Sequence, residues 1–258
     1  MNKIHPTAII EKGAVIGDNV EIGPYCIVGP QVTLNNDCVL RSHVVIEGRT
    51  TIGKENVFFQ FASIGSDPQD LKYHHEDSML TIGESNTFRE GVTIHKGTEV
   101  GRGKTTIGDQ NLVMGYVHVA HDCQIGSDNV LANYTGLAGH IVLDDHITIG
   151  GFTGITQFVR IGSYSYIGAG TTIDKHIAPY TTGYGNRIQV KGVNIVGLKR
   201  RGFSREAINN IMDVHRLFFR SEMNEKDAMR SIKEQYGHLQ EVQMFIDFVS
   251  SVEGGVRK

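Results

Sequence analysis

Residues 14–23 read Ala14-Val15-Ile16-Gly17-Asp18-Asn19-Val20-Glu21-Ile22-Gly23, and this stretch contains the unit from which most of the chain is built. An aliphatic residue or Phe recurs at every sixth position, often followed by Gly, and a small or β-branched residue usually stands four places after it. A short fixed period of this kind is typical of solenoid proteins. The lead residues are Ile4, Ile10, Ile16, Ile22, Val28, Leu34, Leu40, Ile46, Ile52, Phe58, Ile64, Ile82, Phe88, Ile94 and, after a slip of one residue, Ile107, Val113, Val119, Ile125, Leu131, Leu137, Leu143, Ile149, Ile155, Ile161, Ile167 and Ile173.

A six-residue period fits neither an α-helix, whose period is 3.6 residues, nor a strand with strict alternation. It fits a parallel β-helix with three flat faces and one hexad per face. The lead residue and the residue four places on would both point inward. Gly after the lead would permit the tight corner, because Gly adopts positive φ without Cβ strain. Three hexads make one coil, so we expect residues about 18 apart to stack on one another.

The composition excludes several classes of protein. The chain has 258 residues and a formal net charge of −3, whereas a nucleic-acid-binding protein is usually basic. It contains no apolar run of about 18 residues, so we expect no transmembrane helix. The repeat begins at once near the N-terminus, which leaves no room for a signal peptide.

The three cysteines, Cys26, Cys38 and Cys123, all fall at the small inward position of a hexad. We therefore expect buried free thiols that act as small apolar residues. No Cys-x-x-Cys pair supports a zinc site, and a disulfide is not expected in a cytosolic chain.

Two stretches interrupt the repeat, at about 66–81 and 97–106. Both should be loops that leave the prism. Loops on a rigid scaffold often carry function, and the alternative is that they are harmless insertions.

After about residue 190 the pattern becomes helical. Apolar residues spaced by three and four follow Ser204, which can cap a helix, and Asn224 can cap a second helix that ends near Gly237. A third is expected over about 239–252. We predict a β-helix over 1–190 and a C-terminal helical domain over 191–258, which would close the open end of the solenoid.

The densest polar cluster in the repeat surrounds His121. This residue is third in its hexad and should lie outside the prism, with Gly139 stacked on it and Gln157 one coil further. His140, beside Gly139, would share this surface. A neutral imidazole is a suitable general base near pH 7. Asp122 would orient the ring or stabilise its cation, or it is only a turn residue.

A second cluster, Lys199-Arg200-Arg201, precedes the helix that Ser204 caps. Arginine side chains suit a diphosphate or an acidic protein surface. The alternative is an ordinary solvated run of charges.

The chain resembles, nearly end to end, the UDP-N-acetylglucosamine O-acyltransferases that begin lipid A synthesis. Hexads alone are weak evidence, because many acyltransferases share them, but their combination with the first loop and the arginine-rich segment is specific. The matching stretches are His5-Pro6-Thr7-Ala8, Gln60-Phe61-Ala62-Ser63-Ile64-Gly65, Gln69-Asp70-Leu71-Lys72-Tyr73, 89–98 (REGVTIHKGT), 118–123, Leu137-Ala138-Gly139-His140 and 192–208 (GVNIVGLKRRGFSREAI).

The resemblance implies a cytoplasmic homotrimer with sites between neighbouring subunits. It implies transfer of an (R)-3-hydroxyacyl chain from acyl carrier protein to the 3-hydroxyl of UDP-N-acetylglucosamine, with no metal, cofactor or prosthetic group. His121 matches the family's general base, Asp122 the acid beside it, and the Gly139 amide the oxyanion donor. By position, Gln69 and Asp70 match sugar contacts, and Lys72 matches a cation near the substrate. Further ligand contacts are matched by His118, His140 and Gln157. Contacts to the nucleotide end are matched by Asn194, Arg200 and Arg201.

Three positions depart from the family pattern. The family usually has His where this chain has Thr156, and an acid where it has Val196. Both bear on how the nucleotide is held and on whether the acceptor is a hydroxyl or an amine. Ala169 matches the position that limits acyl length. A pocket discriminates one methylene by about 1–3 kcal/mol, and Ala is little larger than Gly, so we expect an acyl chain of about 12–14 carbons.

The predicted fold is therefore mainly β, a left-handed parallel β-helix of hexapeptide repeats with a C-terminal α-helical domain. One alternative function is a related N-acyltransferase that acts on a 3-amino sugar nucleotide. Others are an acetyl-CoA-dependent enzyme, an inactive paralogue that acts as a scaffold, and a zinc-dependent hydratase, which would need three converging histidines.

Overall fold

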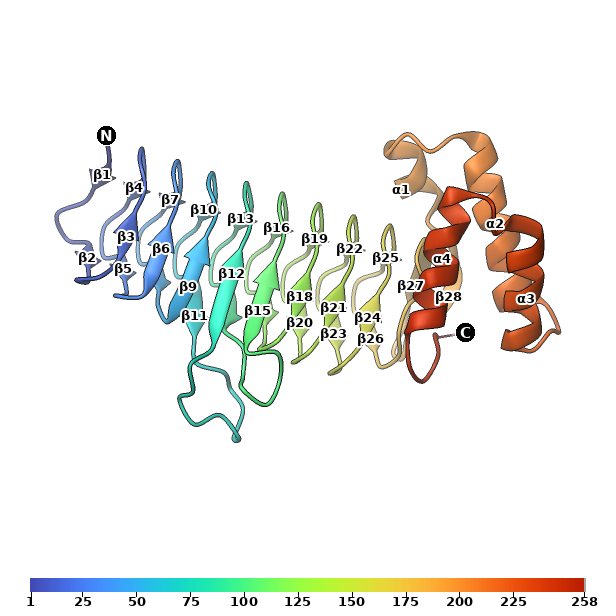
Figure 1. The fold of residues 1–258 in the computed structure, drawn as a ribbon. Helices are drawn as coiled ribbons and strands as arrows, with labels where there is room; N and C mark the ends of the chain where they lie inside the picture. Colours follow the sequence, from blue (N-terminus) through green and yellow to red (C-terminus); the bar gives the residue numbers. More distant parts are fainter. Residues whose placement is uncertain (258) are drawn as a thin grey trace.

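The computed structural model describes residues 1–257. Coils of short strands stack along one axis from the N-terminus to a group of helices at the C-terminal end (Figure 1). The strands form three sheets of 11, 9 and 8 strands, here named sheets A, B and C, which are the three faces that the hexads predict.

Each sheet takes one strand from almost every coil. Sheet A contains β1 (Lys3–Ile4), β4 (Glu21–Ile22), β7 (Val39–Leu40), β10 (Val57–Phe58), β13 (Thr87–Phe88), β16 (Leu112–Val113), β19 (Val130–Leu131), β22 (Thr148–Ile149), β25 (Tyr166–Ile167), β27 (Thr181–Tyr184) and β28 (Gln189–Val193). Sheet B contains β2 (Ile9–Ile10), β5 (Ile27–Val28), β8 (Val45–Ile46), β11 (Ser63–Ser66), β14 (Thr93–His95), β17 (His118–Val119), β20 (Gly136–Leu137), β23 (Gly154–Ile155) and β26 (Thr172–Ile173). Sheet C contains β3 (Val15–Ile16), β6 (Val32–Leu34), β9 (Arg49–Ile52), β12 (Met79–Ile82), β15 (Lys104–Ile107), β18 (Gln124–Ile125), β21 (Val142–Leu143) and β24 (Arg160–Ile161).

Neighbouring coils pair in parallel with the predicted spacing, since Ile4 pairs with Ile22 and Val113 with Leu131. The lead residues from Ile22 onward are buried in one hydrophobic core. The three cysteines are buried free thiols, as predicted. Burial raises the pKa of Cys123 to about 12, so this thiol is an unreactive core group.

The glycine that follows the lead residue has a different role from the one predicted. Apart from Gly65 (83°), these glycines do not have positive φ, which occurs instead mostly three places after the lead and at other residue types, for example at Asn19 (56°) and Tyr134 (61°). A Cβ built on Gly53 would lie 2.4 Å from the carbonyl oxygen of Gly83 in the next coil. A small residue is therefore needed because the backbones of neighbouring coils approach closely.

Both interruptions of the repeat are loops that leave the prism at the corner between sheets B and C (Figure 1). They are shorter than predicted: residues 67–78 connect β11 to β12, and residues 96–103 connect β14 to β15. Residues 79–81 and 104–106 belong to strands, in which they continue the ladder of β9. These strands extend beyond the two residues of a regular hexad, which the six-residue period does not reveal.

The C-terminal part contains α1 (Ile195–Arg200), α2 (Arg205–Arg220), α3 (Glu225–Tyr236) and α4 (Gln240–Ser251). The predicted caps are present, because the side chains of Ser204 and Asn224 accept hydrogen bonds from the amides of Ala207 and Asp227. The sequence pattern does not predict α1. The helices share a second hydrophobic core with the last coil. None of the helices within residues 1–257 combines the length and the hydropathy needed to cross a membrane.

Candidate active site

His121 lies at the corner between sheets B and C, in the turn that joins β17 to β18. Gly139 stacks on it as the spacing predicts: a Cβ built on Gly139 would lie 2.6 Å from Cε1 of the imidazole. Any side chain at position 139 would therefore displace the ring. His121 is outside the prism, but its surroundings leave it only 5% exposed, so it is not the freely solvated side chain that its place in the hexad suggests.

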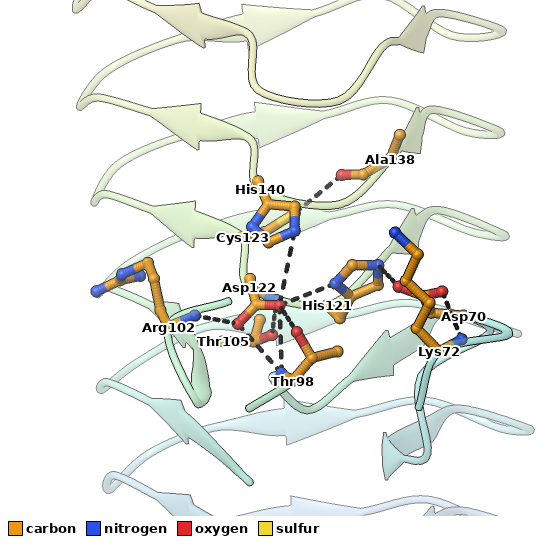
Figure 2. A network of polar contacts seen from close by, with 10 residues as sticks. All are labelled: Asp70, Lys72, Thr98, Arg102, Thr105, His121, Asp122, Cys123, Ala138 and His140. Carbon is orange, nitrogen blue, oxygen red and sulfur yellow. Dashed lines mark hydrogen bonds and ion pairs between the residues drawn. The ribbon is translucent and has the colours of Figure 1, made fainter. Parts of the chain in front are cut away.

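Asp122, the next residue, is fully buried and faces the His121 ring (Figure 2). Nδ1 of His121 lies 2.9 Å from Oδ2 of Asp122. The same carboxylate accepts hydrogen bonds from the Thr98 hydroxyl at 2.6 Å, the Thr98 amide at 3.2 Å and the Arg102 amide at 2.8 Å. An ionised carboxylate only accepts hydrogen bonds, so Nδ1 carries the proton and Nε2 keeps a free lone pair.

The electrostatics of the corner follow from these contacts. Burial by itself raises the pKa of the Asp122 carboxyl, but the hydrogen bonds from Thr98, His121 and the Arg102 amide outweigh it, and the pKa is lowered from its ordinary value. Asp122 is therefore ionised at neutral pH. The site consists of an imidazole held against a buried anion, which is the arrangement of a general base and its orienting acid.

Three further histidines surround this pair. The His140 ring lies edge-on to His121 at 5.1 Å and stacks on Phe158 at 4.6 Å. His118 and His95 pack edge to face at 4.9 Å. Burial lowers the pKa of His118 and His140, and that of His95 to about 4. These three rings are therefore neutral at pH 7 and provide hydrogen-bonding groups without positive charge.

The loop formed by residues 67–78 brings a carboxylate to the free nitrogen of His121. Oδ2 of Asp70 lies 3.9 Å from Nε2 of His121, and the Lys72 amide donates to the other Asp70 oxygen at 3.0 Å (Figure 2). Asp67 ties this loop to the first residue of the second loop through an ion pair with Lys96 at 2.9 Å. A hydroxyl placed between Nε2 and Asp70 can transfer its proton to the imidazole.

A groove of about 880 Å³ lies on sheet A, between strands of the last coils and α1. Its lining includes Arg200, Arg201, Tyr166 and Val196. Asn194 caps α1 by accepting from the Gly197 amide at 3.0 Å. Sheet A is the face opposite the corner between sheets B and C, so within one chain the groove is on the other side of the prism from His121.

Comparisons with known proteins establish the family. Residues 3–36, 13–48 and 104–139 match the bacterial transferase hexapeptide family, and residues 177–257 match domain 2 of the UDP-N-acetylglucosamine O-acyltransferases. The acyl-[acyl-carrier-protein]–UDP-N-acetylglucosamine O-acyltransferase of Thermodesulfovibrio yellowstonii is 43% identical over 256 residues, which cover 99% of both chains. The chain belongs to the UDP-N-acetylglucosamine O-acyltransferase family.

Solved structures of this acyltransferase family have the same fold. A UDP-N-acetylglucosamine acyltransferase from Bacteroides fragilis superposes with a TM-score of 0.96 at 38% identity, covering 99% of this chain and 100% of that one. The O-acyltransferase from Moraxella catarrhalis also gives 0.96, at 45% identity and 99% coverage of both chains. The predicted left-handed β-helix with C-terminal helices and the predicted acyltransferase class are thereby confirmed.

In this acyltransferase chain the residues expected at the site separate into two groups. The groove on sheet A carries Asn194, Arg200 and Arg201. The corner between sheets B and C carries Gln69, Asp70, Lys72, His118, His121, Asp122, Gly139, His140 and Gln157. Of these, Gln69, Lys72 and Gln157 are exposed. Ala169 belongs to neither group, because it is exposed at the corner between sheets A and B. A single chain does not bring the two groups together.

Sequence reasoning missed the residues that surround Asp122. Thr98 and Arg102 come from the second loop, and Thr105 in the following strand β15 accepts a hydrogen bond from the Asp122 amide at 2.8 Å. The available signal is the composition of residues 97–103, in which glycines flank a threonine just before the coil that carries the polar cluster.

The acyltransferase corner also contains a group of possible metal ligands. Donor atoms of His121, Asp122 and His140 lie within 4.8 Å of one another. A zinc hydratase needs three converging histidines, whereas here Nδ1 of His121 points at Asp122, whose oxygens accept hydrogen bonds from the second loop. This donor set favours proton transfer by a histidine–aspartate pair.

Proposed function

We propose that this chain transfers an (R)-3-hydroxyacyl chain from acyl carrier protein to the 3-hydroxyl of UDP-N-acetylglucosamine, the first step of lipid A biosynthesis. The observation that carries the proposal is the His121–Asp122 pair, whose free Nε2 faces Asp70. A base near pH 7 is what an alcohol needs in order to attack a thioester. The T. yellowstonii relative is named for both substrates.

In the proposed reaction the sugar hydroxyl attacks the thioester carbonyl while Nε2 of His121 takes its proton. A carbon–oxygen bond forms, and the carbonyl electrons move to the oxygen. When the tetrahedral intermediate collapses, the carbon–sulfur bond breaks and the imidazolium returns the proton to the departing thiolate of the carrier. The buried anion of Asp122 stabilises the imidazolium between these two steps.

The Gly139 amide is the proposed donor to the oxyanion. The amides on either side of it donate hydrogen bonds to carbonyl oxygens of neighbouring coils. The Ala138 amide donates to Ile155 at 3.2 Å, and the His140 amide donates to His121 at 3.0 Å. No described residue accepts a hydrogen bond from the Gly139 amide itself. A preorganised amide beside the base stabilises the developing charge at no reorganisation cost.

The proposed assembly is a homotrimer with one site at each boundary between subunits. Its support is the separation of His121 from the groove of Arg200 and Arg201, which lies on the opposite face. One substrate can meet both only if neighbouring chains contribute one each. In this arrangement the arginines bind the diphosphate of the nucleotide, because guanidinium groups pair well with phosphate.

The remaining residues have proposed roles at the same shared site. The proposed location of the protein is the cytoplasm. Ala169 is proposed to limit the acyl chain to about 12–14 carbons, since one methylene changes binding by about 1–3 kcal/mol. Gln69 and Asp70 would contact the sugar, and Lys72 would contact a negative group of the substrate. Further polar groups of the ligands would be contacted by His118, His140 and Gln157. Asn194 would contact the nucleotide end in addition to capping α1.

Purified protein incubated with (R)-3-hydroxytetradecanoyl-acyl carrier protein and UDP-N-acetylglucosamine, followed by mass spectrometry, tests the proposal. The expected product is the 3-O-ester. The 3-amino sugar nucleotide runs in parallel, because Thr156 and Val196 mark a possible change of acceptor. Product only with the amine would replace the proposal by the N-acyltransferase, and no product with either would favour the scaffold protein.

A further inference from the structure

The loop formed by residues 96–103 is folded around one side chain, the carboxylate of Asp122. The Thr98 carbonyl accepts hydrogen bonds from the amides of Gly101 and Gly103, at 3.1 and 2.8 Å, which close a tight turn. Inside this turn the amides of Thr98 and Arg102 and the Thr98 hydroxyl all donate to Asp122. Figure 2 shows the Arg102 side chain pointing away, so this residue holds the carboxylate through its backbone alone.

The fit leaves no room for a side chain at position 101, on the inner surface of the loop. A Cβ built on Gly101 would lie 2.4 Å from Oδ2 of Asp122. From the other side, the hydroxyl of Thr105 accepts a hydrogen bond from the Asp122 amide at 2.8 Å. Both the backbone and the side chain of Asp122 are therefore fixed by residues 98–105.

The fold does not need a carboxylate at this place. The corresponding residues of the next two coils are His140 and Phe158, whose rings stack on one another. A buried anion is costly unless it is fully hydrogen-bonded. Its benefit is to His121, which is bonded to the same Oδ2 that the Thr98 hydroxyl contacts at 2.6 Å.

We propose that Thr98 is a positioning residue for acyl transfer, acting through Asp122 to direct Nε2 of His121 toward the substrate. Its hydroxyl fixes the rotation of the carboxylate, so that Oδ2 stays aimed at Nδ1 and the imidazole keeps the tautomer with a free Nε2. Without the hydroxyl the carboxylate turns toward the two amides, and the ring is held less well. The inference rests on the proposed function for its catalytic consequence, but not for its structural one.

The test compares Thr98→Val, which removes the hydroxyl at nearly constant shape, with Thr98→Ser, which retains it. The first readout is the tautomer of His121, measured in histidine-labelled protein by long-range proton–nitrogen NMR, with His121→Gln to assign the signal. We expect the tautomer protonated at Nδ1 in the wild type and in Thr98→Ser, and a mixture in Thr98→Val. An unchanged tautomer in Thr98→Val would overturn the inference whether or not the protein transfers acyl groups.

The second readout is steady-state kinetics. The loss of a hydrogen bond to a charged group predicts a fall in kcat of about 10-fold for Thr98→Val with KM for both substrates nearly constant, and Thr98→Ser should restore most of the rate. In an Asp122→Asn background the same substitution should cost less than about twofold, because the two residues act as one unit. Additive losses would mean that Thr98 only supports the loop. A tautomer shift in a protein without acyl transfer would refute the proposed function and leave the positioning of His121 standing.

Discussion

Two corners of the prism have the same backbone and very different chemistry. At the corner between sheets A and B, Tyr116, Tyr134 and Phe152 stack along successive coils, with Tyr134 and Phe152 at 4.9 Å and 14°. At the corner between sheets B and C the equivalent series is Asp122, His140 and Phe158. All six residues have positive φ, for example 59° at Tyr116 and 60° at Asp122.

The difference arises from one residue type and one loop. The aromatic corner carries no long loop between residues 116 and 152, and its rings are largely exposed, 50% at Tyr134 and 71% at Phe152. At the other corner a carboxylate replaces the first ring, and residues 96–103 fold over it. The repeat supplies a position with fixed backbone geometry, and the inserted loop converts it into a buried anion beside a base.

The largest effect should come from removing the base. His121→Ala is expected to lower turnover by roughly 10²–10⁴-fold, since this is the usual contribution of general base catalysis. The matched control is His43→Ala, because His43 stacks between Tyr25 and Phe61 at the aromatic corner. The control should retain activity within about twofold. A loss of less than about tenfold in His121→Ala, at unchanged melting temperature, would remove His121 from the proposed mechanism.

The second effect is on the free energy of unfolding, and it depends on pH. Burial, followed by the charges of His118 and His121, lowers the pKa of His95 to about 4. Between pH 6.5 and 4 the unfolded chain therefore binds more protons than the folded one. The stability that neutral His95 contributes is complete above about pH 6.5 and is lost as pH falls toward 4, by roughly 3 kcal/mol.

Denaturation at pH 7 and pH 4.5 measures this loss. His95→Leu should remove a substantial part of the decline. His215 in the helical core, whose burial also lowers its pKa to about 4, supplies a similar share, and His118 and His140, whose pKa values burial lowers as well, add to it. An equal decline in His95→Leu and wild type would contradict the assignment.

The third substitution makes the two corners more alike. Asp122→Asn keeps the shape of the side chain and removes its charge, which costs a charge-assisted hydrogen bond of about 1.5–3 kcal/mol. We expect kcat to fall by about 10- to 100-fold with KM nearly unchanged. Activity within twofold of wild type would show that the buried anion serves the loop and not the imidazole.

The smallest effect concerns the groove on sheet A. Arg201→Ala should raise KM for the sugar nucleotide by about tenfold and change kcat little, because its proposed role is to bind a group that does not react. Inhibition by UDP should weaken by the same factor. Saturation behaviour equal to that of wild type would separate Arg201 from nucleotide binding.

The fold of the periodic part of this molecule could be predicted from its sequence. Spacing alone stacks Gly139 on His121 and buries the three cysteines, because the hexads set both register and facing. The prediction that the glycine after the lead residue provides positive φ was wrong. The hexad pattern carries no information on how closely the backbones of neighbouring coils approach, and this close approach is what requires a small residue there.

What lies outside the period was not predictable in the same way. The hydrogen bonds from Thr98 and Arg102 depend on the conformation of a loop that does not repeat. Helix α1 is short, and Asn194, chosen as a ligand contact by resemblance, is also its cap. The hexad pattern does not by itself place Arg201 and His121 on different sides of the prism, because Arg201 follows the repeat and is positioned by α1 beside sheet A.

The hydrogen bonds of the Asp122 carboxylate and amide all come from residues close to it in the chain, within 24 residues on the N-terminal side. From the C-terminal side only Nε2 of His140 approaches among the described ion pairs, at 3.9 Å from Oδ2. Because each coil of a solenoid contacts only its neighbours, the histidine–aspartate pair can be complete as soon as the coil that contains it has closed. The groove, in contrast, needs α1 and the last coils. During synthesis the base would thus be in place well before the nucleotide groove, and a chain shortened before α1 would keep its proton acceptor while losing the arginines.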